Sequence, residues 1–130
     1  MHENKLTLFL VSIEEKKAEK VEIEHSLNAF YRAIHCIYDC IDIVRYEIGG
    51  KAFDIICDDD GLSRNPHHVS VISPEGDAML VGSFLVANHD SAGDTRSLTE
   101  KDIELIKRNI VTVRTSNLPE PHPILMAKYG

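Results

Sequence analysis

The chain has no tryptophan, only three cysteines among its 130 residues, and an aromatic content of 6%. An odd number of cysteines does not make a disulfide framework, and so few aromatic residues leave no evident stacking platform for single-stranded nucleic acid. No apolar run reaches the roughly 18 residues of a membrane span. The short apolar run from Leu6 to Val11 carries no cleavage-site pattern, so we predict no signal peptide and expect a cytoplasmic protein.

Positive charge is also scarce, since 21 acidic residues face 14 basic ones and the net charge is −7. Sequence-independent binding to nucleic acid depends on Lys and Arg that neutralise phosphates, so direct nucleic-acid binding is not expected. The acidic residues are scattered along the chain, which favours an ordinary solvated surface over a mimic of DNA. The length and the 43% hydrophobic content fit one domain with a core of its own.

The clearest local pattern is a β-hairpin within Cys40–Leu62, turning at Gly49-Gly50. Glycine adopts the positive φ angles that tight hairpin turns require. This turn pairs Tyr46 with Phe53 and gathers the apolar side chains on one face. That face is predicted to carry Val44, Tyr46, Ile48, Phe53, Ile55 and Cys57, while Arg45, Glu47, Asp54 and Ile56 lie on the other. The apolar residues change from odd positions, Ile41 and Ile43, to even ones, Val44 and Tyr46. This change predicts a bulge near Ile43-Val44, or a strand start that is buried on both faces.

The remaining pattern alternates strands with two helices. Strands are predicted at 5–12, 18–24, 68–73 and 78–87, with a last edge strand at 110–115. One helix should follow the N-cap Ser26 to about Tyr38, and a second should follow Thr99 with a capping box to Asp102. This order predicts an α+β fold: a mixed or antiparallel sheet with a helix packed across one face and a second, C-terminal helix. A β-grasp-like roll is one compatible topology. Residues 1–115 are expected to form a single domain, and residues 116–130 a Pro-rich tail.

Candidate chemistry is concentrated in the loop between the hairpin and the next strand. Its Asp triplet offers oxygen ligands for a hard cation, but the spacing of an EF-hand is missing, so a solvated turn is the simpler interpretation. The cysteines and histidines lack the paired spacing of a zinc site, and no nucleophile elbow or phosphate-binding loop is present. We therefore predict no metal, no cofactor and no catalytic residue. The loop residues that could bind a ligand are Asp58, Asp60, Arg64, His67 and His68.

Two longer segments carry a family resemblance. AFDIICDDDGLSRNP and MLVGSFLVANHDSAGDTRSLTEKDIELI resemble the domain-of-unknown-function family 3846, over roughly Ile41 to Ile110. Members of that family are similar to small proteins encoded by phages, prophages and conjugative elements of gut and other Gram-positive bacteria. The resemblance implies no catalytic residues, and the Pro-rich segment after Ile110 departs from the family pattern.

Size, acidic charge, the lack of a catalytic constellation and the resemblance together favour one functional hypothesis. The chain would be a non-enzymatic accessory protein of a mobile genetic element that acts by binding a protein partner, for example a component of host defence. One alternative is a small-ligand or metal-binding protein, or an enzyme, that uses the Asp58–His68 loop. Another is a structural homodimer that pairs through a sheet edge or the tail.

Overall fold

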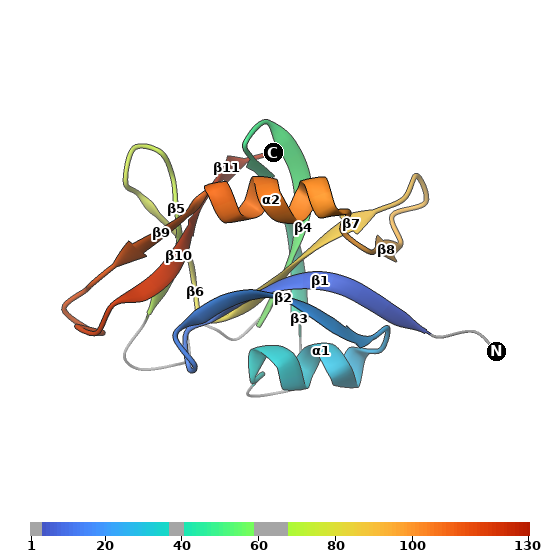
Figure 1. Cartoon of the computed structure of the whole chain (residues 1–130), viewed down its shortest axis with the longest axis horizontal. Helices are drawn as coiled ribbons and strands as arrows, with labels where there is room; N and C mark the ends of the chain where they lie inside the picture. The colour runs from blue at the N-terminus through green and yellow to red at the C-terminus, as the bar shows by residue number, and fades with distance from the viewer. Residues whose placement is uncertain (1–3, 37–40, 59–67) are drawn as a thin grey trace.

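The computed structural model describes residues 4–36, 41–58 and 68–130, and Figure 1 shows how their strands and helices are arranged. Two helices, α1 (Leu27–Ile34) and α2 (Glu100–Arg108), accompany eleven strands in this part of the chain. The strands are β1 (Lys5–Ser12), β2 (Lys17–Glu24), β3 (Ile41–Ile48), β4 (Lys51–Asp58), β5 (Val69–Ile72), β6 (Ala78–Val81), β7 (Phe84–His89), β8 (Thr95–Arg96), β9 (Ile110–Val113), β10 (His122–Met126) and β11 (Lys128–Tyr129). The prediction of an α+β fold with two helices is confirmed.

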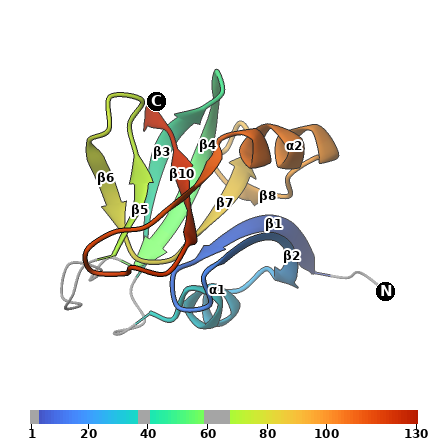
Figure 2. The same ribbon diagram turned by 60° about the vertical axis from the view of Figure 1, so that its left-hand side comes forward.

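The strands form two sheets. The larger sheet has the order β11-β3-β4-β7-β1-β2, with β8 paired to β7, and its pairs are antiparallel. The smaller sheet has the order β6-β5-β10-β9 and is mixed, because β10 runs parallel to β5. Figure 2 shows β5, β6 and β10 of the smaller sheet beside the β3–β4 hairpin. The interior position of β1 agrees with its two apolar faces.

The β3–β4 hairpin has the predicted register, with Tyr46 opposite Phe53 and the two glycines at the turn. Pairing continues without a shift to Ile41 opposite Asp58, so the predicted bulge near Ile43-Val44 is wrong. The alternative of a doubly buried strand start is wrong as well, because 49% of Ile43 is exposed. The change of apolar phase has another cause: Ile41 and Ile43 face the side of the sheet on which α1 lies, and Val44 and Tyr46 face the other side.

The larger sheet separates two hydrophobic cores. Figure 1 shows α1 and α2 on opposite sides of it. On the α1 side, Phe30 and Ile34 of the helix pack against the sheet residues Leu6, Leu8, Leu10, Ile56, Leu85 and Ala87. On the other side, Ile103 and Ile106 of α2 and Val71 and Leu125 of the smaller sheet pack against Phe9, Val11, Tyr46, Ile48, Phe53, Ile55, Cys57, Phe84 and Val86. Both faces of the central strands are thus largely removed from water.

Both helices begin at the predicted N-caps. Ser26 accepts a hydrogen bond from the Ala29 N–H at 3.2 Å, and Thr99 forms the predicted capping box with Asp102. The first helix ends earlier than expected, at Ile34 instead of near Tyr38, which lies outside the described residues. It ends there because His35 adopts a left-handed conformation with φ of 55° and terminates the helical hydrogen-bond pattern.

The apolar stretch 78–87 is two strands and not one. Gly82 lies between β6 and β7 with φ of 84°, and its N–H donates to the carbonyl of His68 at 2.9 Å. The chain therefore leaves the smaller sheet after β6 and enters the larger sheet at β7. Ser83, which is buried, accepts a hydrogen bond from the Ile13 N–H at 2.8 Å and ties this crossing to the end of β1.

The Pro-rich segment after Thr115 contributes two strands. β10 lies between β5 and β9 inside the smaller sheet, and its Leu125 is completely buried. β11 pairs with the outer edge of β3, with Lys128 opposite Glu47 and Tyr129 opposite Tyr46. The side chain of Tyr129 packs edge-on against that of Tyr46, with ring centroids 5.9 Å apart.

Candidate functional site

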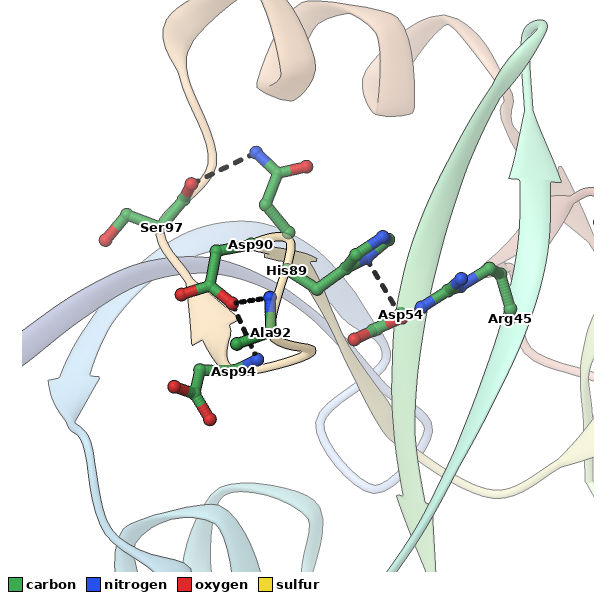
Figure 3. Close-up of polar contacts among 8 residues, drawn as sticks. Arg45, Asp54, His89, Asp90, Ala92, Asp94 and Ser97 are labelled. Carbon is green, nitrogen blue, oxygen red and sulfur yellow. Dashed lines mark hydrogen bonds and ion pairs between the residues drawn. The ribbon is translucent and has the colours of Figure 1, made fainter.

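One part of the larger sheet's α1 side carries charged residues. Side chains on a strand alternate between faces, so Asp54 on β4 lies on the same face as Ile56, which packs under α1. Arg45 is directly opposite Asp54 on β3, and His89 follows Leu85 and Ala87 on that face of β7. Figure 3 shows Asp54 between Arg45 and His89. We call the surface formed by Ile43, Arg45, Asp54 and His89 the β3 face.

Asp54 is the buried centre of the β3 face, with only 5% of its surface exposed. The Nη2 and Nε atoms of Arg45 donate to its Oδ1 at 3.3 and 3.4 Å. Nδ1 of His89 lies 3.3 Å from the same oxygen, close enough for an ion pair when the imidazole is protonated, but not aligned as a hydrogen bond. A buried carboxylate needs compensation of this kind, because an unpaired charge in the interior is strongly unfavourable.

The Arg45 guanidinium contacts buried Asp54 on one side and is exposed on the other. Half of the Arg45 side chain is exposed, whereas the carboxylate that it contacts is buried. A guanidinium has five N–H donors in a rigid fork, and among residues 4–36, 41–58 and 68–130 those of Arg45 bond only to Asp54, which leaves the others to a ligand or partner. Both residues lie on paired strands of the sheet, which gives the guanidinium a defined direction before anything binds.

The turn after β7 is closed by hydrogen bonds and directly follows His89. Oδ1 of Asp90 accepts hydrogen bonds from the N–H groups of Ala92 and Asp94 at 2.9 and 3.0 Å (Figure 3). Arg96 lies 2.7 Å from its Oδ2. These contacts, above all the hydrogen bond from the Asp94 backbone, lower the pKa of Asp90 and outweigh the opposite effect of burial. The turn therefore anchors the end of β7 from which His89 projects.

A second charged cluster joins α2 to the larger sheet. Asp102 is buried and receives hydrogen bonds from Lys51 at 2.6 Å, Asn88 at 2.8 Å and the Thr99 N–H at 2.9 Å. Burial alone would raise the pKa of Asp102, but the hydrogen bonds from Lys51, Thr99 and Asn88 outweigh it and lower the pKa to about 2. Because the capping box already occupies this carboxylate, we interpret the cluster as a structural one.

A small pocket lies at the tip of the β3–β4 hairpin. Its volume is about 190 Å³, and it is lined by Glu47, Gly49, Gly50, Pro74, Asn109, Met126, Ala127 and Lys128. Pockets for drug-sized ligands usually measure about 300–1,000 Å³, so this space is too small for such a ligand. A Cβ at Gly49 would collide with the side chain of Leu105, which shows how closely the turn approaches α2.

The predicted loop site is described only at its two ends. Asp58 is the last residue of β4, half-buried and opposite Ile41 in the larger sheet. His68 directly precedes β5 in the smaller sheet, and its buried Nδ1 has no hydrogen-bond partner in the described part of the chain. Asp60, Arg64 and His67 lie outside the described residues. Among residues 4–36, 41–58 and 68–130, no group of three or more His, Cys, Asp or Glu side chains is placed to hold a metal ion.

The sequence did contain part of the signal for the β3 face. The hairpin register already places Arg45 opposite Asp54, and a charged residue between Phe53 and Ile55 stands out in an apolar strand. His89 could not be found in this way, because it reaches Asp54 only through the pairing of β4 with β7, which are distant in sequence.

No helix in the described ranges combines the length and apolar character needed to cross a membrane.

Comparisons with known proteins identify the family alone. A search of curated proteins finds no significant match, and a search of solved structures finds none either. The family described as "Domain of unknown function (DUF3846)" matches residues 6–110, from β1 to the start of β9, and confirms the resemblance seen in the sequence. The chain belongs to the DUF3846 family.

Proposed function

We propose that this protein is a non-enzymatic accessory protein that binds a protein partner through the β3 face. The observation that carries the proposal is an exposed apolar side chain, Ile43, beside the held guanidinium of Arg45. Tryptophan, tyrosine and arginine are the residue types that most often dominate the energy of protein interfaces, and burial of a neighbouring apolar side chain adds to it. Isolated exposed apolar residues are common, so the fixed neighbouring arginine is what distinguishes this position.

The energetics of such an interface favour a preorganised surface. Full burial of an isoleucine side chain contributes roughly 1.5–3 kcal/mol, so covering the exposed half of Ile43 would contribute about 1 kcal/mol. Binding normally costs about 0.5–1.5 kcal/mol for each long side chain that becomes immobile. The two long contacts with Asp54 offset part of that cost for Arg45, because they favour one orientation of its guanidinium in the free protein.

We place the protein among the accessory proteins of mobile genetic elements. The resemblance to small proteins of phages, prophages and conjugative elements supports this context. A protein of the bacterial host, such as a component of its defence systems, is the partner class that this context favours. The absence of a recognisable catalytic constellation in the sequence is consistent with action by binding.

Differential affinity capture from a lysate of the host tests the proposal. The baits are the wild-type chain, Ile43→Glu and Arg45→Ala, with Thr112→Glu and Arg108→Ala as matched controls at exposed positions outside the β3 face. Thermal unfolding of each bait first establishes that it is folded. We expect a protein that is retained by the wild type and both controls but lost with both β3-face variants. Equal retention by all five baits, or by none, would refute the proposal.

A further inference from the structure

We propose that the partner supplies an extended segment that adds as a strand to the open outer edge of β3, with an acidic residue opposite Arg45 and a basic residue opposite Asp42. This inference rests on the proposed function and names its mode of recognition. Addition of a strand to a sheet edge is a common mode of peptide recognition, in which backbone hydrogen bonds supply affinity and side-chain pairs supply specificity.

The outer edge of β3 is only partly covered. β4 pairs with β3 along its whole length, from Ile41 to Ile48. On the other side, β11 pairs only with Tyr46 and Glu47, and the Gly130 N–H donates to the Arg45 carbonyl at 3.3 Å. Within the described ranges, residues 41–44 therefore have no strand on their outer side. The existing pairing shows that this edge accepts an antiparallel strand.

Along residues 41–44, every second residue points its backbone N–H and carbonyl groups outward, away from β4, as strand addition requires. The Arg45 carbonyl points outward to Gly130, and backbone groups alternate along a strand, so those of Ile43 and Ile41 point outward as well. Oδ1 of Asp42 accepts the outward N–H of Ile43 at 2.9 Å. The side chain of Asp42 thus satisfies this donor while the edge is empty, and an incoming strand replaces it with a backbone carbonyl.

The side chains define both the register and the direction of the added segment. Arg45 and Ile43 lie on the α1 side of the sheet, and Asp42 lies on the other side. An antiparallel segment that complements these side chains has four consecutive residues. From its N-terminal end, an acidic residue faces Arg45, any residue faces Val44, an apolar residue faces Ile43 and a basic residue faces Asp42. A shift by one residue moves every side chain to the wrong face, and a parallel segment needs the reverse order.

The pairing of β11 follows the same rule. Its basic Lys128 lies opposite the acidic Glu47 on this edge. The acidic residue of the partner would take the place beside Arg45 that Gly130 now holds through one long hydrogen bond. Gly130 is exposed and has no side chain, so its displacement removes little else.

A displayed library of random seven-residue peptides is the direct probe. The library is selected on the full wild-type chain and depleted on the Ile43→Glu variant. We expect the surviving peptides to be enriched in the order acidic, any, apolar, basic. We also expect Asp42→Lys, a change at an exposed position, to weaken their binding roughly tenfold, and replacement of the peptide's basic residue by glutamate to restore it. Survivors without this order, no survivors, or no rescue by the swapped pair would overturn the inference.

Two measurements on a selected peptide separate strand addition from side-chain binding alone. Bound peptide should slow hydrogen exchange of the Ile43 amide, and N-methylation of the peptide's apolar residue should abolish binding, because that N–H donates to the Ile43 carbonyl. An unchanged amide or a fully active N-methylated peptide would overturn strand addition. If a captured host protein still depends on Ile43 and Arg45 in that case, the proposed function stands and only this mode of recognition fails.

A second copy of the chain is the competing occupant. Light scattering at high protein concentration should give the mass of one chain for both the wild type and Ile43→Glu. A wild-type dimer that Ile43→Glu dissociates would assign the edge to self-association and overturn a partner segment.

Discussion

Removal of the Asp102 charge should destabilise the fold in a way that depends on pH. The pKa of this carboxyl falls from an ordinary value of 3.8 to about 2 in the folded chain. At 1.36 kcal/mol per pKa unit, the ionised form contributes about 2 kcal/mol to stability at neutral pH. Asp102→Asn preserves the shape of the side chain but removes the charge that Lys51 and the Thr99 N–H contact. We therefore expect the free energy of unfolding at pH 7 to fall by about 2 kcal/mol.

The sign of the pH dependence follows from the direction of the shift. A lowered pKa in the folded state means that the stabilisation is complete above 3.8 and is lost as the pH falls toward 2. The difference between wild type and Asp102→Asn should shrink to about half by pH 3. Urea denaturation at pH 7, 5 and 3 measures it. Glu104→Gln removes an exposed charge from the same helix and should change stability by less than about 0.5 kcal/mol. A constant difference across these pH values, or one below about 0.5 kcal/mol at pH 7, would show that the Asp102 charge does not stabilise the fold.

Three further predictions follow from burial. Asp54→Leu should change the unfolding free energy by less than about 1 kcal/mol, because the buried charge is removed and the half-exposed Arg45 that remains stays hydrated. It should weaken partner capture up to about tenfold, because Arg45 loses its orienting contact. Destabilisation well above about 1 kcal/mol would contradict this. Leu125→Ala should lower the free energy of unfolding, measured by urea denaturation, by about 3 kcal/mol, because Leu125 is fully buried. Leu27→Ala at an exposed site should lower it by less than about 0.5 kcal/mol. Equal losses would mean that β10 does not contribute to the core. Burial raises the pKa of Tyr46 to about 12, so its neutral form stabilises the fold below pH 10 and this stability is lost as the pH rises from 10 to 12. Ultraviolet titration should show one tyrosine that ionises at higher pH than the others, and Tyr46→Phe should remove it.

Local patterns predicted local structure well. Gly49-Gly50 determined the register of the β3–β4 hairpin, because the turn fixes which residues face each other. Thr99 and Asp102 predicted the start of α2, because the capping box involves residues only three apart. In both cases the deciding interaction lies within a few residues, so it can be read without knowledge of the tertiary structure.

Long-range structure was harder to predict. The apolar stretch around Gly82 reads as one strand, because nothing local indicates that its two halves belong to different sheets. The left-handed His35 ended α1 before its apolar periodicity did. The β3 face was recognisable only in part, since the pairing of Arg45 with Asp54 is local but the approach of His89 depends on the β4–β7 contact.

Site-specific photo-crosslinking in living host cells shows whether the β3 face contacts a host protein. A photoreactive residue is placed either at Ile43 on the β3 face or at Thr112, an exposed position on β9 in the other sheet. We expect position 43 to crosslink one host protein and position 112 not to crosslink it. Crosslinking of that protein from position 112 with equal yield, or no crosslinked protein from position 43, would contradict this expectation.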